Sequence, residues 1–186
     1  MTCTQADVDT SILGAALRSI GVLVGTPHSE ETPARLHRYL IYWSHWTTDP
    51  PFNVTTFRNE HPRVDQLITI PGISFWSCCS HHLLPFHGKA TVGYLPNERI
   101  IGLSKMTQVV RWMAKKPQVQ EHLAHEIADF LEERLDPLGL AVYIRAWHTC
   151  QMLSVGPDAP QMVTTVLRGR LKKHPAKDEF LMEVQR

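Results

Sequence analysis

Two short clusters of thiols and imidazoles hold the residues whose types and spacing favour metal chemistry. They are Cys78-Cys79-Ser80-His81-His82 and, well downstream, His148-Thr149-Cys150. Cys79 and His82 are three positions apart and would share one face of a helical turn. His148 and Cys150 are two positions apart and would share one face of a strand. Two such pairs can close three sides of a tetrahedron around Zn²⁺, which prefers thiolate and neutral imidazole ligands.

The spare histidines decide what kind of zinc site to expect. A structural zinc uses four protein ligands, whereas three leave one position open for water. With Cys79, His82 and Cys150 as ligands, His81 and His148 remain beside them. An open position next to two imidazoles favours a catalytic site. Either pair alone also fits the ordinary alternative, in which cysteines are small buried hydrophobes.

The composition is that of a globular protein large enough for one real core. The chain has 186 residues, of which 43% are hydrophobic and 20% charged. A net charge of +1 argues against a nonspecific nucleic-acid partner, and the apolar run 20–25 is too short to span a bilayer. Four cysteines, two of them adjacent, suit metal in a reducing compartment better than a disulfide framework, and no signal peptide is evident. We therefore expect a cytoplasmic protein with no nucleic-acid and no membrane partner.

The first part of the chain reads as helical. Apolar spacing predicts a helix over 8–20, and Thr32-Pro33 supplies a capping hydroxyl followed by proline at the first helical position. On that second helix Arg35 and Arg38 are three apart, so they can present charge to one spot or simply form a solvated face. Because the segment 47–62 reads as a loop with one short strand, we expect an N-terminal helical region, 1–46, and a second domain, 47–186.

The remaining elements predict an α+β fold. Strands are expected at 67–70, 89–94, 100–103, 140–150 and 163–167, with a turn at Pro71-Gly72 and two consecutive helices over 104–113 and 123–135. Ser104 is the expected N-cap of the first of these helices. Since the helices are grouped rather than alternating with strands, the sheet should be antiparallel and covered on one face.

These motifs, taken together, resemble the GTP cyclohydrolase I family. The similarity covers about 32–180 in order and rests on the runs 77–82, 88–90, 102–105, 111–121 and 148–150. The resemblance implies the tunnelling fold, in which a four-stranded antiparallel sheet carries two helices on one face. It also implies self-association, because subunits of that family join their sheets into a barrel, a five-membered ring stacked on a second to give a homodecamer.

The resemblance also implies a reaction. Members of the family are hydrolases that open the guanine imidazole ring of GTP, release formate and form 7,8-dihydroneopterin triphosphate, a precursor in folate, biopterin and deazaguanine routes. Zinc provides activated water for this chemistry. The expected cofactor is therefore Zn²⁺, and the expected substrate is a guanine nucleotide.

Residue roles carry over by position. The implied zinc ligands are Cys79, His82 and Cys150, and the implied catalytic residues are His81, His148 and Ser104. The implied substrate contacts are Glu121, Gln120, Lys105, Arg35 and Arg38. Among these, Glu121 would read the guanine edge, because a carboxylate can accept two hydrogen bonds from N1–H and the 2-amino group. The three cations would meet the triphosphate.

Three positions depart from the family pattern. Gln108 and Ser154 stand where the family has arginines that bind the triphosphate, and Ser80 stands where it has glutamate. Each lost arginine contact would remove about 1.5–3 kcal/mol. The hypothesis that follows is a guanine nucleotide with fewer phosphates or a modified sugar. The candidate replacements are Arg111, Arg145, Arg168 and Arg170.

Three other functions fit parts of the pattern. A noncatalytic module that binds zinc and a purine explains the cysteines but not the spare histidines. The nitrile reductases of the same fold use a cysteine nucleophile and NADPH without zinc. A hydrolase that stops at ring opening or formate release would never close the pterin ring.

Overall fold

The computed structural model describes residues 10–44, 50–60 and 66–185. The chain divides into two compact units, residues 1–45 and 46–186. The boundary expected after residue 46 and the start of the helix expected at residue 8 lie outside the described residues. Within the described ranges, every helix is too short or too polar to cross a lipid bilayer.

The first unit contains two helices. Helix α1 spans Thr10–Ser19 and helix α2 spans Thr32–Ser44, and the two are in contact. The start of α2 at Thr32 is the one that Thr32-Pro33 predicts, because the fixed φ of proline suits the first helical turn. Arg35 and Arg38 both lie on α2, and Arg35 forms an exposed ion pair with Glu31 at 3.0 Å.

The second unit is built on one sheet. Its strands lie in the order β5-β2-β3-β6-β7, and a separate two-stranded ribbon pairs β1 with β4. The strands are β1 Thr56–Arg58, β2 Ile68–Cys79, β3 Pro85–Leu95, β4 Arg99–Ile101, β5 Pro117–Gln118, β6 Gly139–His148 and β7 Met162–Gly169. The four long strands β2, β3, β6 and β7 are antiparallel, and only the two-residue β5 is parallel to its neighbour.

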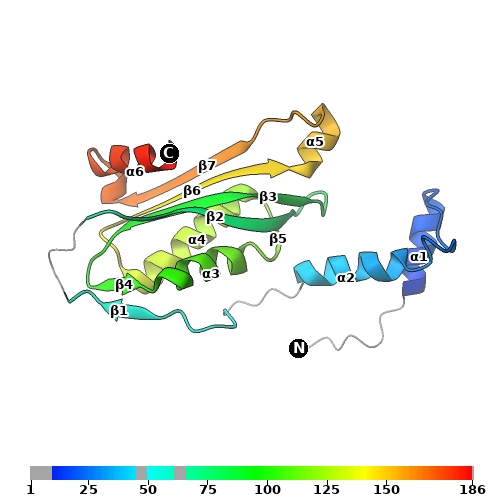
Figure 1. Ribbon diagram of the computed structural model, residues 1–186, viewed down its shortest axis with the longest axis horizontal. Coiled ribbons are helices and arrows are strands. Elements are labelled where there is room, and N and C mark those ends of the chain that lie inside the picture. Colours follow the sequence, from blue (N-terminus) through cyan, green and yellow to red (C-terminus); the bar gives the residue numbers. More distant parts are fainter. Residues whose placement is uncertain (1–9, 45–49, 61–65, 186) are drawn as a thin grey trace. The chain divides into compact units, whose positions relative to one another are not determined.

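Helices cover the sheet unequally (Figure 1). They are α3 Leu103–Met113, α4 Gln120–Leu135, the short α5 Thr149–Val155, the 3₁₀ turn η1 Arg170–Lys172 and α6 Ala176–Gln185. Helices α3 and α4 lie along one face, where they bury the main core with alternate residues of β3, among them Phe86 and Val92. Helix α6 lies on the opposite side and buries Phe180 against Leu95 and Ala141. The predicted α+β class, with a four-stranded antiparallel sheet and two helices on one face, is confirmed.

Four local predictions are wrong, and each error has a physical reason. Pro71-Gly72 is no turn: β2 continues through it as a bulge, and Gly72 supplies the positive φ of 68°. Ser104 is no N-cap, because α3 begins at Leu103, with Gly102 in the extended cap position. Cys79 ends a strand rather than lying on a helical turn. The strand expected over 140–150 stops at His148, so Cys150 lies on α5.

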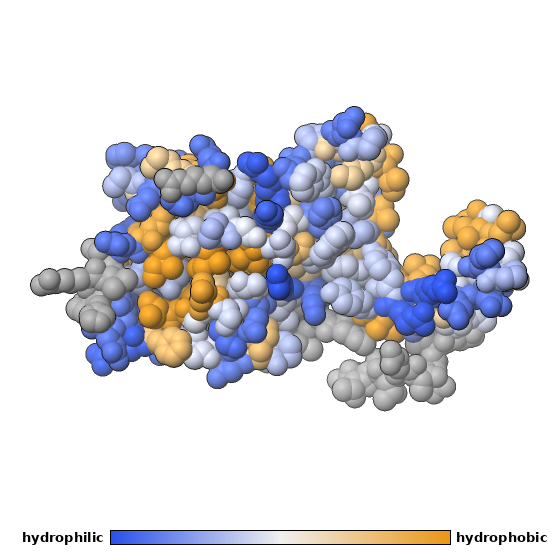
Figure 2. Space-filling view, viewed as in Figure 1, coloured by the Kyte–Doolittle hydropathy of each residue, from blue (hydrophilic) through white to orange (hydrophobic). Residues whose placement is uncertain are grey.

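Both long edges of the sheet carry backbone that pairs with no described strand. On β2 the described pairing to β5 involves Cys78 and Cys79 alone, and β7 pairs on one side only, with β6. Figure 2 shows apolar surface gathered over the part of this unit where β2 and α3 lie. Open strand edges beside apolar surface are the features that favour strand addition from another chain.

Candidate active site

A tight turn brings the first thiol and imidazole together. Cys79 is the last residue of β2, and the chain reverses directly after it, so that Leu83 N donates to Cys79 O at 2.8 Å. Leu83 has φ of 52°, which L-residues rarely adopt. The turn places Cys79 Sγ 3.7 Å from His82 Nδ1. The two residues therefore meet through a reversed strand end rather than through a helix.

The second thiol arrives from the neighbouring part of the sheet. Strand β6 ends at His148, and α5 starts at Thr149, whose hydroxyl donates to Pro85 O at 2.6 Å. This contact ties the strand-to-helix junction to the start of β3. Cys150 then lies in the first turn of α5, next to the end of β2.

The three expected ligands meet. One ligand atom from each of Cys79, His82 and Cys150 lies within 4.8 Å of the other two. Burial raises the pKa of the Cys150 thiol, and the neighbouring Cys79 raises it further. Two adjacent thiols and one imidazole fit tetrahedral zinc with one open position. The donor set and its spacing are therefore consistent with the zinc site typical of the family that the sequence resembles.

His148 is held from two sides. Its Nε2 lies 2.9 Å from Gln120 Oε1, and its ring stacks on Phe86 with centroids 4.5 Å apart and planes 6° apart. Burial lowers the pKa of His148, and the charge of Glu121 opposes that shift. Glu121 therefore lies close enough to act on the imidazole, which remains in its neutral form near pH 7.

Gln120 is completely buried, and its amide is fully engaged. Its Nε2 group faces two backbone carbonyl oxygens, Ile144 O at 3.3 Å and Met162 O at 3.2 Å. Carbonyl oxygens can only accept, so Nε2 must be the donor and Oε1 must face His148. His148 therefore donates from Nε2–H, which leaves its Nδ1 as the free base.

Close approach of two strands supports this arrangement. At Gly88 on β3, an added Cβ would lie 2.1 Å from Arg145 O and 2.6 Å from Ala146 Cα on β6. A side chain there would push the two strands apart directly beside the Phe86–His148 pair. Glycine at this position therefore has a packing reason.

The remaining predicted residues lie in three places. His81 is exposed beside His82, with ring centroids 6.2 Å apart. Ser104 and Lys105 lie in the first turn of α3, where Lys105 Nζ donates to Gln108 Oε1 at 3.1 Å. Arg35 and Arg38 belong to the other compact unit.

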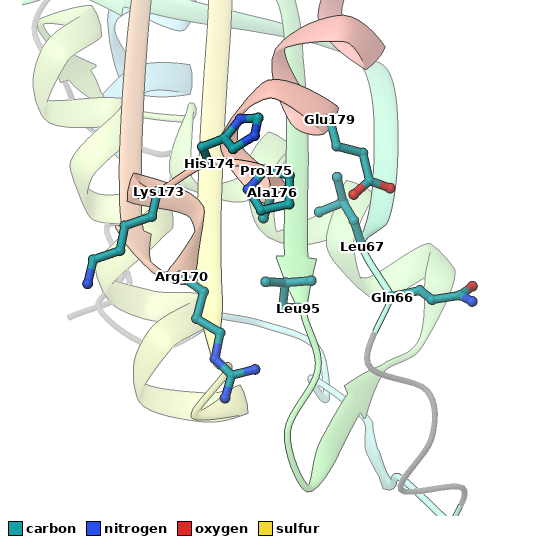
Figure 3. A pocket seen from close by; sticks show the side chains of 9 residues that line it. All are labelled: Gln66, Leu67, Leu95, Arg170, Lys173, His174, Pro175, Ala176 and Glu179. Carbon is teal, nitrogen blue, oxygen red and sulfur yellow. The ribbon is translucent and has the colours of Figure 1, made fainter.

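Three of the four arginines suggested as replacements have other contacts, and the fourth lies far from His148. Arg111 Nε donates to Ser74 O, and Arg145 donates to the Tyr143 hydroxyl. Arg168 on β7 pairs with Asp129 and Glu132 of α4. Arg170 lines a cavity of about 470 Å³ beyond Leu95, at the end of the sheet opposite His148. Figure 3 shows the side chains of Arg170 and Lys173 pointing in different directions around that cavity, so they do not converge on one anion.

Several known proteins are similar to this chain. The family model described as GTP cyclohydrolase I matches residues 11–186. GTP cyclohydrolase 1 of a Hydrogenobaculum species is 40% identical over 166 residues, covering 88% of this chain and 89% of that protein. The Janthinobacterium protein of the same name is 42% identical over 159 residues, covering 82% and 78%. A crystal structure of an archaeosine synthase QueF-like protein is 13% identical, covers 55% of this chain and 93% of its own, and has a TM-score of 0.48. On the match over nearly its whole length and these identities, the chain belongs to the GTP cyclohydrolase I family.

Proposed function

We propose that this protein is a zinc-dependent GTP cyclohydrolase I, which hydrolyses the guanine imidazole ring of GTP, releases formate and forms 7,8-dihydroneopterin triphosphate. The carrying observation is the convergence of Cys79, His82 and Cys150 within 4.8 Å, next to a histidine whose orientation is fixed. Family membership supports the same reaction and substrate.

Cys79, His82 and Cys150 would hold the zinc. When bound there, zinc supplies Lewis-acid activation of water for attack on the purine. His148 is neutral and presents Nδ1 as a base, so it can take up a proton and return it as the ring opens. His81, exposed beside the ligands, is the second proton-transfer group. A positioned acid or base contributes roughly 10²–10⁴-fold to such a step.

Glu121, in the first turn of α4, is the residue proposed to bind the guanine edge. Its carboxylate can accept hydrogen bonds from N1–H and the 2-amino group of guanine. Ser104 and Lys105, in the first turn of α3, supply a polar contact and a cation for the phosphates. Arg35 and Arg38 supply further cations from α2. Gln120, sequestered under His148, supports the site through that histidine.

A second candidate substrate is a guanine nucleotide with fewer phosphates or a modified sugar. Positions 108 and 154 are neutral, and both side chains are engaged locally. Gln108 accepts from Lys105, and the Ser154 hydroxyl donates to Cys150 O at 3.1 Å. Turnover of GTP, GDP, GMP and dGTP separates the two candidates, because an overwhelming preference for GTP would exclude the second.

We also propose self-association into a homodecamer and a cytoplasmic location. The open edges of β2 and β7 support joining of sheets between copies, and mass measurement of the zinc-loaded protein in solution tests the assembly. The reduced thiols required by the zinc site support a reducing compartment.

The deciding experiment follows formate and pterin fluorescence separately in zinc-loaded protein given GTP. We expect both products. Formate without fluorescence would indicate a hydrolase that stops early, and neither product would leave a noncatalytic zinc module. Reduction of a nitrile with NADPH by zinc-free protein would indicate the nitrile reductase reaction. Cys79→Ala should abolish zinc binding and formation of both products. Cys78 is the buried neighbour of Cys79 outside the ligand cluster, so Cys78→Ala should still bind zinc and form both products.

A further inference from the structure

The sheet face turned away from α3 and α4 carries a stack of three aromatic rings. Trp76 on β2, His87 on β3 and Trp147 on β6 are direct cross-strand partners. Trp76 and His87 stack with ring centroids 4.4 Å apart and planes 23° apart, and His87 and Trp147 with centroids 5.6 Å apart and planes 28° apart. We call these three residues the aromatic ladder.

The ladder leaves much indole surface exposed. Trp76 is 58% exposed and Trp147 is 40% exposed, although each stacks on His87. Cross-strand aromatic pairs do stabilise sheets, but that contribution comes from the faces in contact. The outward surfaces of both indoles remain available for another flat ring, and such stacking is worth about 0.5–1.5 kcal/mol beyond area burial.

The next cross-strand pair on the same face consists of two cations. Lys89 and Arg145 are cross-strand partners on β3 and β6, and both are exposed. The Arg145 guanidinium donates to the Tyr143 hydroxyl at 2.7 Å, a neutral partner that leaves its charge uncompensated. In the described part of the chain, neither cation forms an ion pair with a carboxylate. Glu183 is the single acid lining the adjoining cavity, so it and the two cations together keep a net positive charge.

The ladder and the two cations line one cavity of about 410 Å³. That volume is in the range of small-molecule sites, roughly 300–1,000 Å³. We propose that this cavity binds a planar aromatic molecule carrying a carboxylate or a phosphate, with its ring against the exposed indole of Trp76 and its anion between Lys89 and Arg145. The aromatic residues and the two cations are adjacent cross-strand pairs on one face of the sheet, so a single small molecule can contact both.

This site is separate from the zinc site but lies directly behind it. Trp147 and His148 are consecutive on β6, and His87 and Phe86 are consecutive on β3. Because successive side chains of a strand point to opposite faces, the Phe86–His148 pair and the ladder lie back to back across the sheet. GTP bound at the zinc site would therefore leave the ladder free.

Three matched probes test the proposal on the zinc-loaded full chain. They are 1-naphthyl phosphate, 1-naphthoate and the neutral 1-naphthalenemethanol, with inorganic phosphate as the ring-free control. Calorimetry should show saturable binding of at least one naphthyl anion, at least ten times tighter than the alcohol or inorganic phosphate. The tighter of the two anions identifies the preferred charged group. Equal affinity for the alcohol, or no binding by either anion, overturns the proposal.

Variants locate the binding. Trp76→Leu and the pair Lys89→Gln with Arg145→Gln should each weaken binding of the best probe at least tenfold, while Lys172→Gln, at an exposed residue of η1, should not. Indole N–H signals of Trp76 and Trp147 should shift on titration, and those of the buried Trp43 and Trp112 should not. A melting temperature for each variant verifies folding. Displacement of the probe by GTP, or unchanged affinity in the folded double variant, would refute a separate site.

Discussion

Gln120 Oε1 accepts a hydrogen bond from His148 Nε2 across 2.9 Å, joining the first residue of α4 to the last residue of β6. The amide that makes this contact is anchored to the backbone of β6 and β7 and has no exposed surface. The imidazole is thus fixed in tautomer and in direction by a group that a bound nucleotide need not touch.

Replacement of Gln120 should lower turnover more than it changes substrate binding. Gln120→Leu removes the acceptor for His148 Nε2–H and leaves buried carbonyls unpaired, so we expect stability to fall by about 1–3 kcal/mol. We expect kcat to fall about 10–100-fold, part of the usual worth of a positioned base, with KM for GTP within about threefold. Steady-state kinetics and thermal melts give both numbers.

The matched control is Gln118→Leu. Gln118 is also a buried glutamine, and its amide donates to Met113 O at 2.8 Å rather than bonding to His148. It should lose similar stability with little change in kcat. A Gln120 variant that keeps kcat and raises KM would instead make Gln120 a substrate contact.

The apparent affinity for zinc should increase as the pH rises. The pKa of Cys150 is raised by burial and by Cys79, so the metal-free thiol carries its proton at neutral pH. A thiol must lose that proton to bind metal, so below the thiol pKa the apparent affinity gains about one log unit per pH unit for each proton released. Calorimetry in buffers of different ionisation enthalpy counts the protons. Cys150→Asp, a ligand already ionised at pH 6–8, should lower the count by about one, and an unchanged count would mean that Cys150 does not bind.

Placing a cation at position 108 should increase the preference of the enzyme for GTP over GMP. Gln108→Arg adds a charge beside Lys105, and one charge-assisted contact worth about 1.5–3 kcal/mol would raise kcat/KM for GTP over GMP roughly 10–100-fold. Gln108→Met removes the partner of Lys105 without adding charge and serves as the control. If both variants show the wild-type ratio, the side chain at 108 does not reach the phosphates.

Arg168 should matter for stability and not for GTP. It bridges β7 to Asp129 and Glu132 on α4, with its side chain 19% exposed. Arg168→Met leaves both carboxylates without their cation, and we expect a loss of about 1–3 kcal/mol with KM for GTP unchanged. Arg170→Met, an exposed arginine near it in the chain, should be close to neutral. A raised KM with intact stability would instead assign Arg168 to the phosphates.

The sequence predicts the elements better than it predicts their junctions. Long apolar patterns such as that of α4, with Leu123, Ile127 and Leu131 buried, are local signals that survive packing. The end of β6 at His148 depends on the Thr149 contact with Pro85, which is 64 positions away, and no local pattern reveals it. The bulge at Gly72 was hidden for a similar reason, because Pro-Gly also marks turns.

The candidate site shows the same division. The convergence of Cys79, His82 and Cys150 was predictable from residue type and closeness in the chain. The backbone expected for each pair was wrong, because Cys79 ends a strand and Cys150 lies on a helix. The burial of Gln120 was not predictable, because a polar residue at the start of a helix usually faces solvent. The aromatic ladder was also missed. It can be recognised only when the register of three strands is known, because that register makes Trp76, His87 and Trp147 cross-strand partners.

The proposed zinc ligands lie in two places far apart in the chain, around the end of β2 and at the start of α5, and this fixes when metal can be gained during synthesis. A ribosome emits Cys79 and His82 early, but Cys150 only after α4 and β6 have emerged. A nascent chain that lacks β6 offers two ligands and no support for a third. Metallation is thus a late event that requires β6 and the start of α5, and a translation product truncated before Cys150 would compete poorly for the cell's zinc.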